Sequence, residues 1–275
     1  MFRQTSLINP LQTLLLLLLT ALTFGQEIQA LESPNDKEGK SAELDDYLKL
    51  SVVRDAEISP TARHVAWKVF RNDFADDRQD EQLWIGDLAD ASSWQLTRGD
   101  ESVGDYEWSP DGTWIAFTRG KKVFLIRSNG GEAMQLDMEG VGQIGDLRFA
   151  PGGSALYMLG VAEADDWHEA REEAYGDYTV FREEGKYRHI WRQDLSSGMQ
   201  AEGDAVALTR GTEFSVTEFA VSPDGSRIAF AAWPTPHLAD LLKSKVYTIA
   251  AAGGAAQLLA DPPGAPTWAN PRSTA

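Results

Sequence analysis

The sequence contains the stretch Tyr106-Glu107-Trp108-Ser109-Pro110-Asp111-Gly112, followed after Thr113 by Trp114-Ile115-Ala116-Phe117. Proline presets the backbone at the second position of a type I turn, aspartate tolerates the third, and glycine accepts the left-handed conformation that follows. The flanking residues are mostly β-branched or aromatic and alternate with period two, as strands with one buried face do. The stretch therefore predicts a β-hairpin with a fixed register.

The same unit occurs four times along the chain. The other three copies lie at residues 56–67, 147–158 and 219–230. Each copy is followed by a second pair of strand-like segments, within residues 82–97, 122–136, 189–209 and 245–259. In the third of these ranges, the second segment of the pair is residues 207–209. Four antiparallel strands in units of roughly forty residues are typical of a propeller blade. We therefore expect an all-β protein, a β-propeller of four-stranded antiparallel blades.

Two segments interrupt the repeat, and both are predicted to be insertions on the rims of the blades. One spans about residues 162–186 and includes a stretch at 165–173 that favours a short helix, because an aspartate cap precedes good helix formers. The other is an acidic excursion at residues 72–81. Rim insertions are common sites of binding, because strands cannot accept extra residues.

The first 25 residues are predicted to be a signal peptide. Arg3 precedes an apolar stretch at residues 11–24, which is short for a membrane span and suits a signal core. Cleavage is expected before Gln26, or alternatively after Ala30, and an uncleaved anchor is the other reading. Residues 26–50 form a lead-in with a short helix near its end. The predicted location is the periplasm or the extracellular medium.

The last part of the chain resembles the opening of a fifth unit at residues 262–268, but residues 269–275 lack the expected turn. Blades are thus assigned to residues 51–268, as four blades plus the start of a fifth, in an incomplete ring. We expect a truncated or incompletely assembled sequence, the alternative being a finished four-bladed protein. The oligomeric state is left open.

Composition excludes several classes of partner and site. The formal net charge is -17, so neither nucleic acid nor, after signal cleavage, a membrane is an expected partner. The chain has no cysteine, which excludes disulfides and a thiol nucleophile. The histidines lack zinc-ligand spacing and the acids at 73–80 do not follow a calcium-loop order. No cofactor and no metal are expected.

The blade sequences resemble those of bacterial Tol-system propellers and of prolyl oligopeptidase-type serine peptidases. Residues 176–191 and the stretch Trp233-Pro234-Thr235-Pro236 before residues 240–242 resemble the acylaminoacyl-peptidase and dipeptidyl-peptidase branch. The resemblance covers about residues 45–268. It implies a propeller that gates a C-terminal α/β-hydrolase domain with a Ser–His–Asp triad, so that short peptides reach the serine. A stand-alone periplasmic Tol-type propeller that binds protein or envelope partners is the alternative.

No catalytic residue is assigned in this chain, because the Gly-x-Ser-x-Gly elbow of that hydrolase domain is missing from the sequence. The nearest string surrounds Ser154, which we expect in a hairpin turn. Peptide substrates are thus expected to react only in a hydrolase domain absent from these residues, and the chain alone is expected to be inactive. The resemblance also suggests that Glu183 and Glu184 bind the free amino terminus of a substrate, since two carboxylates suit an ammonium group; a solvated acidic loop is the alternative.

Overall fold

The computed structural model describes residues 43–74, 77–162, 174, 176 and 186–261. The chain divides into two compact units, Met1–Leu48 and Lys49–Ala275. In the first unit, the described residues include the short helix α2 (Leu44–Leu48). The predicted signal peptide, the 165–173 helix and the opening of a fifth blade lie outside the described residues. No described helix is long and apolar enough to cross a membrane.

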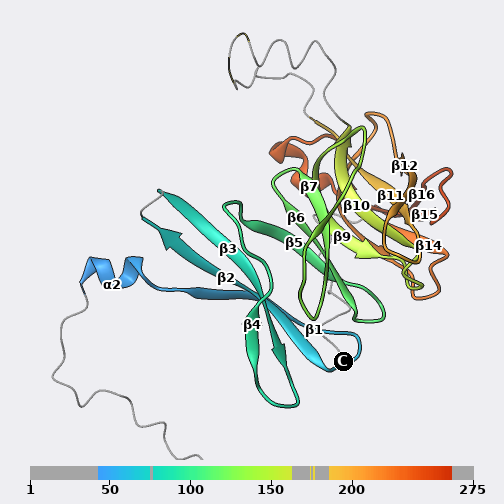
Figure 1. The fold of residues 1–275 in the computed structure, drawn as a ribbon. Coiled ribbons are helices and arrows are strands. Elements are labelled where there is room, and N and C mark those ends of the chain that lie inside the picture. The colour runs from blue at the N-terminus through green and yellow to red at the C-terminus, as the bar shows by residue number, and fades with distance from the viewer. Residues whose placement is uncertain (1–42, 75–76, 163–173, 175, 177–185, 262–275) are drawn as a thin grey trace, which may run out of the picture. The chain divides into compact units, whose positions relative to one another are not determined.

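The described residues of the second unit form four antiparallel sheets of four strands, which confirms the predicted blades. Each sheet is built from strands consecutive in the chain, so each occupies its own part of the colour scale in Figure 1. The first blade comprises β1 (Val52–Ile58), β2 (His64–Asp73), β3 (Arg78–Asp87) and β4 (Ser93–Gln95). The second comprises β5 (Val103–Trp108), β6 (Trp114–Arg119), β7 (Lys122–Arg127) and β8 (Met134–Leu136).

The other two blades follow the same order. The third comprises β9 (Val141–Phe149), β10 (Ala155–Ala162), β11 (Arg188–Leu195) and β12 (Ala201–Ala207). The fourth comprises β13 (Ser215–Val221), β14 (Arg227–Trp233), β15 (Lys245–Ala250) and β16 (Gln257–Ala260), with a 3-10 helix, η1 (Leu238–Lys243), between its second and third strands. β12 begins earlier than the 207–209 segment in which we expected the fourth strand of this blade.

The hairpin turn that joins the first two strands of each blade forms as predicted. In the second blade, Gly112 N–H donates to Ser109 O at 2.8 Å, and Gly112 has φ +70°. The Ser109 hydroxyl donates to Asp111 and accepts from Trp114 N–H, which holds the first residue of the next strand. The fourth blade repeats this arrangement, and hydrogen bonds from Ser222 and Ser226 lower the pKa of Asp224 to about 2.

The acidic segment at residues 72–81 is different from the rim insertion that we expected. β2 and β3 stay paired as far as Asp73 and Arg78, so the described part of this segment is a long β-ribbon. Opposite charges face one another across it: Arg71 lies 3.5 Å from Asp80, its register partner, and Arg78 lies 3.4 Å from Asp73. Such cross-strand pairs favour continued pairing over a loop.

In the described part of the chain, buried apolar residues gather in three clusters, each formed by two consecutive blades. The cluster of the first two blades includes Leu83 and Ile85 from β3, and Ile115 and Phe117 from β6, all fully buried. Since burying a large aliphatic or aromatic side chain stabilises by about 1.5–3 kcal/mol, these clusters hold neighbouring blades together. Among the tryptophans of the blade strands, Trp108 is buried, whereas Trp67, Trp84, Trp114 and Trp191 are half-buried.

A threonine hydroxyl secures the third strand in two of the blades. In the first blade, Thr97 Oγ1 accepts from Leu83 N–H at 2.9 Å and donates to Gln82 Oε1 at 2.9 Å. In the third blade, Thr209 Oγ1 accepts from Ile190 N–H at 3.0 Å and lies 3.2 Å from His189 Nδ1. Both threonines occur in a Leu-Thr-Arg-Gly segment, so the same sequence makes the same contact twice.

Candidate functional site

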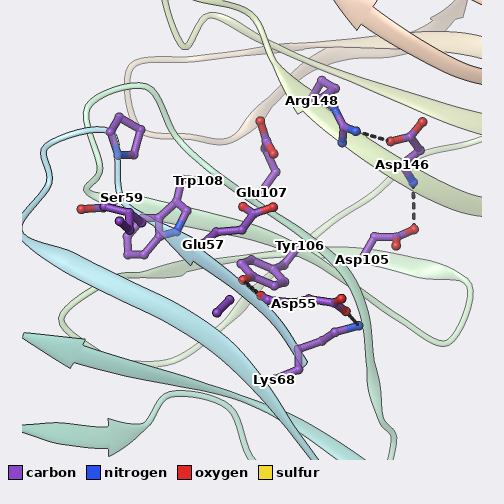
Figure 2. A pocket seen from close by; sticks show the side chains of 13 residues that line it. Asp55, Glu57, Ser59, Lys68, Asp105, Tyr106, Glu107, Trp108, Asp146 and Arg148 are labelled. Atoms are coloured by element: carbon purple, nitrogen blue, oxygen red, sulfur yellow. Dashed lines mark hydrogen bonds and ion pairs between the residues drawn. The ribbon is translucent and has the colours of Figure 1, made fainter. Parts of the chain in front are cut away.

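The candidate site is a cavity of about 850 Å³ lined mainly by the first strands of three blades, β1, β5 and β9. Figure 2 shows the side chains that face it. Among the described residues, the lining includes five carboxylates and two basic side chains: Asp55, Glu57, Asp105, Glu107 and Asp146, with Lys68 and Arg148. Its lining therefore carries a formal net charge of -3 when every group is ionised.

One acid occupies the same position in the first strand of every blade. Asp55, Asp105, Asp146 and Glu218 each lie four residues before the residue that opens the hairpin turn, which is Ser59, Ser109, Ala150 and Ser222. The β-ladder shifts register at or beside the acid in all four strands. A bulge bends a strand and redirects a side chain. The repeat thus places a carboxylate at a bulge in each blade.

The backbone at these bulges is unusual for residues with a side chain. Asp55 and Asp146 both have φ +50°, in the left-handed region. In the second blade the residue before the acid is Gly104, where an added Cβ would approach Thr118 Oγ1 at 2.5 Å. That threonine hydroxyl instead accepts from Asp105 N–H at 2.9 Å, which satisfies a backbone donor left without a ladder partner by the bulge.

Lys68 connects the first two blades at one end of the cavity. Its ammonium lies 2.9 Å from Asp55 Oδ2 and donates to Gly104 O at 3.1 Å, and its side chain is 10% exposed. Tyr106 makes a second connection, since its hydroxyl donates to Ala66 O at 3.0 Å and also contacts Asp55 O. Two polar bridges therefore fix β5 against the first blade.

The second and third blades meet through their acids. Asp105 Oδ2 accepts from Asp146 N–H at 2.9 Å, and an added Cβ at Gly145 would lie 2.9 Å from the same oxygen. Asp146 in turn pairs with Arg148 at 2.7 Å. Figure 2 shows this chain of contacts, from Asp105 through Asp146 to Arg148. Glycine at 145 is what allows the Asp105 carboxylate to approach the backbone of the next blade.

Burial makes ionisation of two of these acids costly. Burial raises the pKa of Asp146, the neighbouring Asp105 raises it further, and Arg148 opposes both effects. Burial and the charge of Asp146 also raise the pKa of Glu218. Carboxylates held close together in partly buried positions favour a cationic ligand, because a positive charge would relieve their repulsion.

Trp108 lines the cavity, and its indole N–H is a buried donor. The residue is 4% exposed, and its indole Nε1–H has no acceptor among the described residues. Within those residues, no group of three or more histidine, aspartate or glutamate side chains is arranged to hold a metal ion. The arrangement supplies carboxylates and an indole N–H donor without a described acceptor, which suits recognition of a polar ligand.

Of the residues singled out by the sequence, only Ser154 is described, and it does not line this cavity. Ser154 is in the turn between β9 and β10, as expected, where Gly153 N–H donates to Ala150 O at 2.8 Å. Glu183 and Glu184 lie outside the described residues. Sequence analysis did not identify the cavity acids. The repeat nevertheless indicates them, because an acid directly precedes each of its four copies when the copies are aligned on the turn.

Comparison with known proteins bears on the family. Residues 59–145 match the model of the dipeptidyl peptidase IV N-terminal region. An uncharacterized peptidase of Bacillus subtilis, YuxL, is 24% identical over 207 residues, which cover 68% of this chain and 30% of that protein. The chain is thus similar to the N-terminal region of dipeptidyl peptidase IV and to a peptidase. It spans about a third of the length of this curated relative.

Solved structures agree on the propeller fold. A prolyl endopeptidase superposes with a TM-score of 0.55 at 15% identity, covering 79% of this chain and 30% of that one. The acylaminoacyl peptidase of Pyrococcus horikoshii gives 0.53 at 13% identity, covering 78% and 33%. TolB of Acinetobacter baumannii gives 0.50 at 18% identity, covering 77% and 44%. At these identities the likeness is one of fold.

Proposed function

We propose that this chain is the substrate-gating propeller of an exported serine exo- or oligopeptidase that cleaves short peptides. The match of residues 59–145 to the dipeptidyl peptidase IV N-terminal region carries this proposal, and the peptidase relative supports it. Chemistry would take place on a separate α/β-hydrolase domain with its own Ser–His–Asp triad. The blades would exclude folded proteins and admit peptides. These peptides would meet the cavity lined by β1, β5 and β9.

Sequencing the gene through and beyond codon 275 is the first test. A reading frame that continues into a Gly-x-Ser-x-Gly elbow would support the proposal. The full-length product should then hydrolyse short chromogenic peptides and leave casein intact, and it should lose activity when the elbow serine is changed to alanine. A product that degrades folded casein as fast as peptides would contradict the gating role.

Glu183 and Glu184 are retained as the proposed binding site for a substrate's amino terminus. In the full-length enzyme, replacing both with glutamine should raise KM for peptides with a free amino terminus and leave KM unchanged for N-acetylated ones. An equal effect on both kinds of peptide would argue against this role.

Export is proposed from the first 25 residues, whose apolar stretch suits a signal peptide. Expression of the natural gene followed by cell fractionation should place the protein in the periplasm or the medium, and N-terminal sequencing should begin at Gln26. Recovery of the intact Met1 terminus from the cytosol would contradict it.

A stand-alone Tol-type propeller is the second candidate, favoured by the superposition on TolB. It predicts a genuine stop after codon 275 and a chain that captures a protein or envelope partner by itself. Affinity purification from the native envelope, with cross-linking, distinguishes this candidate from the peptidase propeller.

A further inference from the structure

The cavity lined by β1, β5 and β9 holds an acid, Asp105, that forms no ion pair with a described basic residue. Lys68 is engaged with Asp55 and Arg148 with Asp146, at 2.9 and 2.7 Å. Asp105 is exposed to the cavity, and no basic group of the described chain lies within 4.0 Å of it. Its Oδ2 accepts from Asp146 N–H, whereas its Oδ1 has no hydrogen bond from a described residue. One carboxylate oxygen therefore remains available for a cation.

The unpartnered indole of Trp108 is the second observation. An indole N–H can only donate, and a buried donor without an acceptor is unfavourable. Figure 2 shows the indole nitrogen of Trp108 on the edge of the ring that is turned toward Glu57, another residue of the lining. A ligand that offers a carbonyl oxygen there would satisfy it. A bare metal ion would not, because a positive N–H edge repels it.

The wall also offers apolar contact. Ile58 lines the cavity with 64% of its surface exposed, and Ala56 and Pro60, two residues before and after it, also belong to the lining. Lysine and arginine carry long aliphatic stems that pack on such surfaces while the charged end reaches a carboxylate. The carboxylate, the N–H donor and the apolar wall thus match the charged end, a carbonyl oxygen and the aliphatic stem of one ligand.

We propose that this cavity binds basic side chains of extended peptides, so that the propeller favours peptides that contain lysine or arginine. Asp105 receives the ammonium or guanidinium group, Trp108 donates to a main-chain carbonyl of the peptide, and Ile58 contacts the stem. This inference rests on the proposed function, since it names the class of peptide that the propeller admits.

The test measures peptide binding to the intact 275-residue chain by fluorescence anisotropy. The probes are fluorescein-labelled, N-acetylated and C-amidated pentapeptides, Ala-Ala-X-Ala-Ala, in which X is lysine, norleucine or glutamate. Blocking the amino terminus removes the group that Glu183 and Glu184 are proposed to bind. We expect the lysine peptide to bind about tenfold more tightly than the norleucine peptide, a difference that corresponds to about 1.4 kcal/mol. Raising the salt concentration should reduce the difference.

Two variants and one control locate the effect. Asp105→Asn should reduce the preference for lysine to less than about threefold, whereas Trp108→Phe should weaken both peptides by a similar factor and keep the preference. The control Asp204→Asn removes the same charge from an exposed position on β12, the outermost strand of its blade, and should leave the preference unchanged. Circular dichroism of each variant verifies that it folds.

The outcomes separate the two proposals. Equal binding of all three peptides would overturn the selectivity for basic side chains and leave the peptide-gating role standing. No binding of any peptide would overturn the selectivity and remove the cavity as the surface that gating uses. A lysine preference that Asp204→Asn abolishes as fully as Asp105→Asn would show a diffuse effect of net charge, and would also overturn the assignment to this cavity.

Discussion

Replacing Thr97 with valine tests how the blades secure their third strands. Valine has nearly the shape of threonine, so the change leaves no cavity and adds apolar surface. It removes the oxygen that accepts from Leu83 N–H at 2.9 Å and the donor to Gln82 Oε1. Leu83 is fully buried, so water cannot replace the lost acceptor.

The magnitude follows from these contacts. A buried donor left without a partner costs about 1–3 kcal/mol. For a domain of about 150–250 residues each kcal/mol lowers Tm by about 2–4 °C, so a loss of about 2 kcal/mol lowers it by roughly 4–8 °C. Thr97→Ser keeps the hydroxyl and loses one methyl group, which costs about 0.8 kcal/mol. Thr97→Val should therefore lower the free energy of unfolding more than Thr97→Ser does, although valine is more hydrophobic than serine.

Urea unfolding followed by tryptophan fluorescence measures both variants, and the nine tryptophans give a strong signal. The slope of the free energy of unfolding against urea should stay constant, since the fold is unchanged. If Thr97→Val is as stable as the wild type while Thr97→Ser is less stable, the methyl group and not the hydroxyl secures the strand. That result would refute the reasoning.

Three further predictions concern charge and close approach. Burial and Asp146 raise the pKa of Glu218, so the stability that its protonated form contributes is lost as the pH rises. Glu218→Gln should therefore raise Tm at pH 7 and have no such effect in acid. A lower Tm at pH 7 would contradict this. Burial lowers the pKa of His189, so the wild type should lose stability as the pH falls below about 6.5, the ordinary histidine value. Between pH 7.5 and 5, urea titrations should show a smaller loss for His189→Gln. Parallel plots of the free energy of unfolding against pH would argue against this. Gly145→Ala places a Cβ 2.9 Å from Asp105 Oδ2, so it should reduce the lysine preference in the anisotropy assay without removing a charge, and an unchanged preference would show that the carboxylate position is unimportant.

The hairpin turns could be predicted from the sequence because their contacts are local. Ser109, Asp111 and Gly112 bond to one another and to the next strand within a few residues, so the pattern alone specifies the geometry. Four repetitions of that pattern were enough to indicate four blades. The family resemblance rests on the same repeat and on the order of its insertions.

The position of β12 could not be predicted because its sequence is a weak strand signal. Ala201–Ala207 contains glycine and two acids, and most of the strand is exposed. Its pairing is fixed partly by the Gln193 side chain, which donates to Glu202 O and Gly203 O across the ladder. Such a contact depends on the three-dimensional register and leaves no periodic pattern.

The cavity acids depend on two levels of structure. The repeat determines that an acid occupies one position in each first strand, and this was available in the sequence. What brings Asp105 to the Asp146 backbone is the bulge together with the missing side chain at Gly145. Those features act between blades, so only the folded chain reveals that the acids line one cavity.

The three shared cores have a consequence for cooperativity. Because each core belongs to two consecutive blades, the stability of the described blades resembles a series of nearest-neighbour couplings, as in linear repeat proteins. The second and third blades contribute to two of these couplings, and the first and fourth to one. A ligand in the cavity touches the first three blades. Its binding energy would therefore stabilise the coupling of the first two blades and that of the second and third blades together, as one cooperative unit. Amide hydrogens far from the ligand, in the outer strands of those blades, would then exchange more slowly when the cavity is filled.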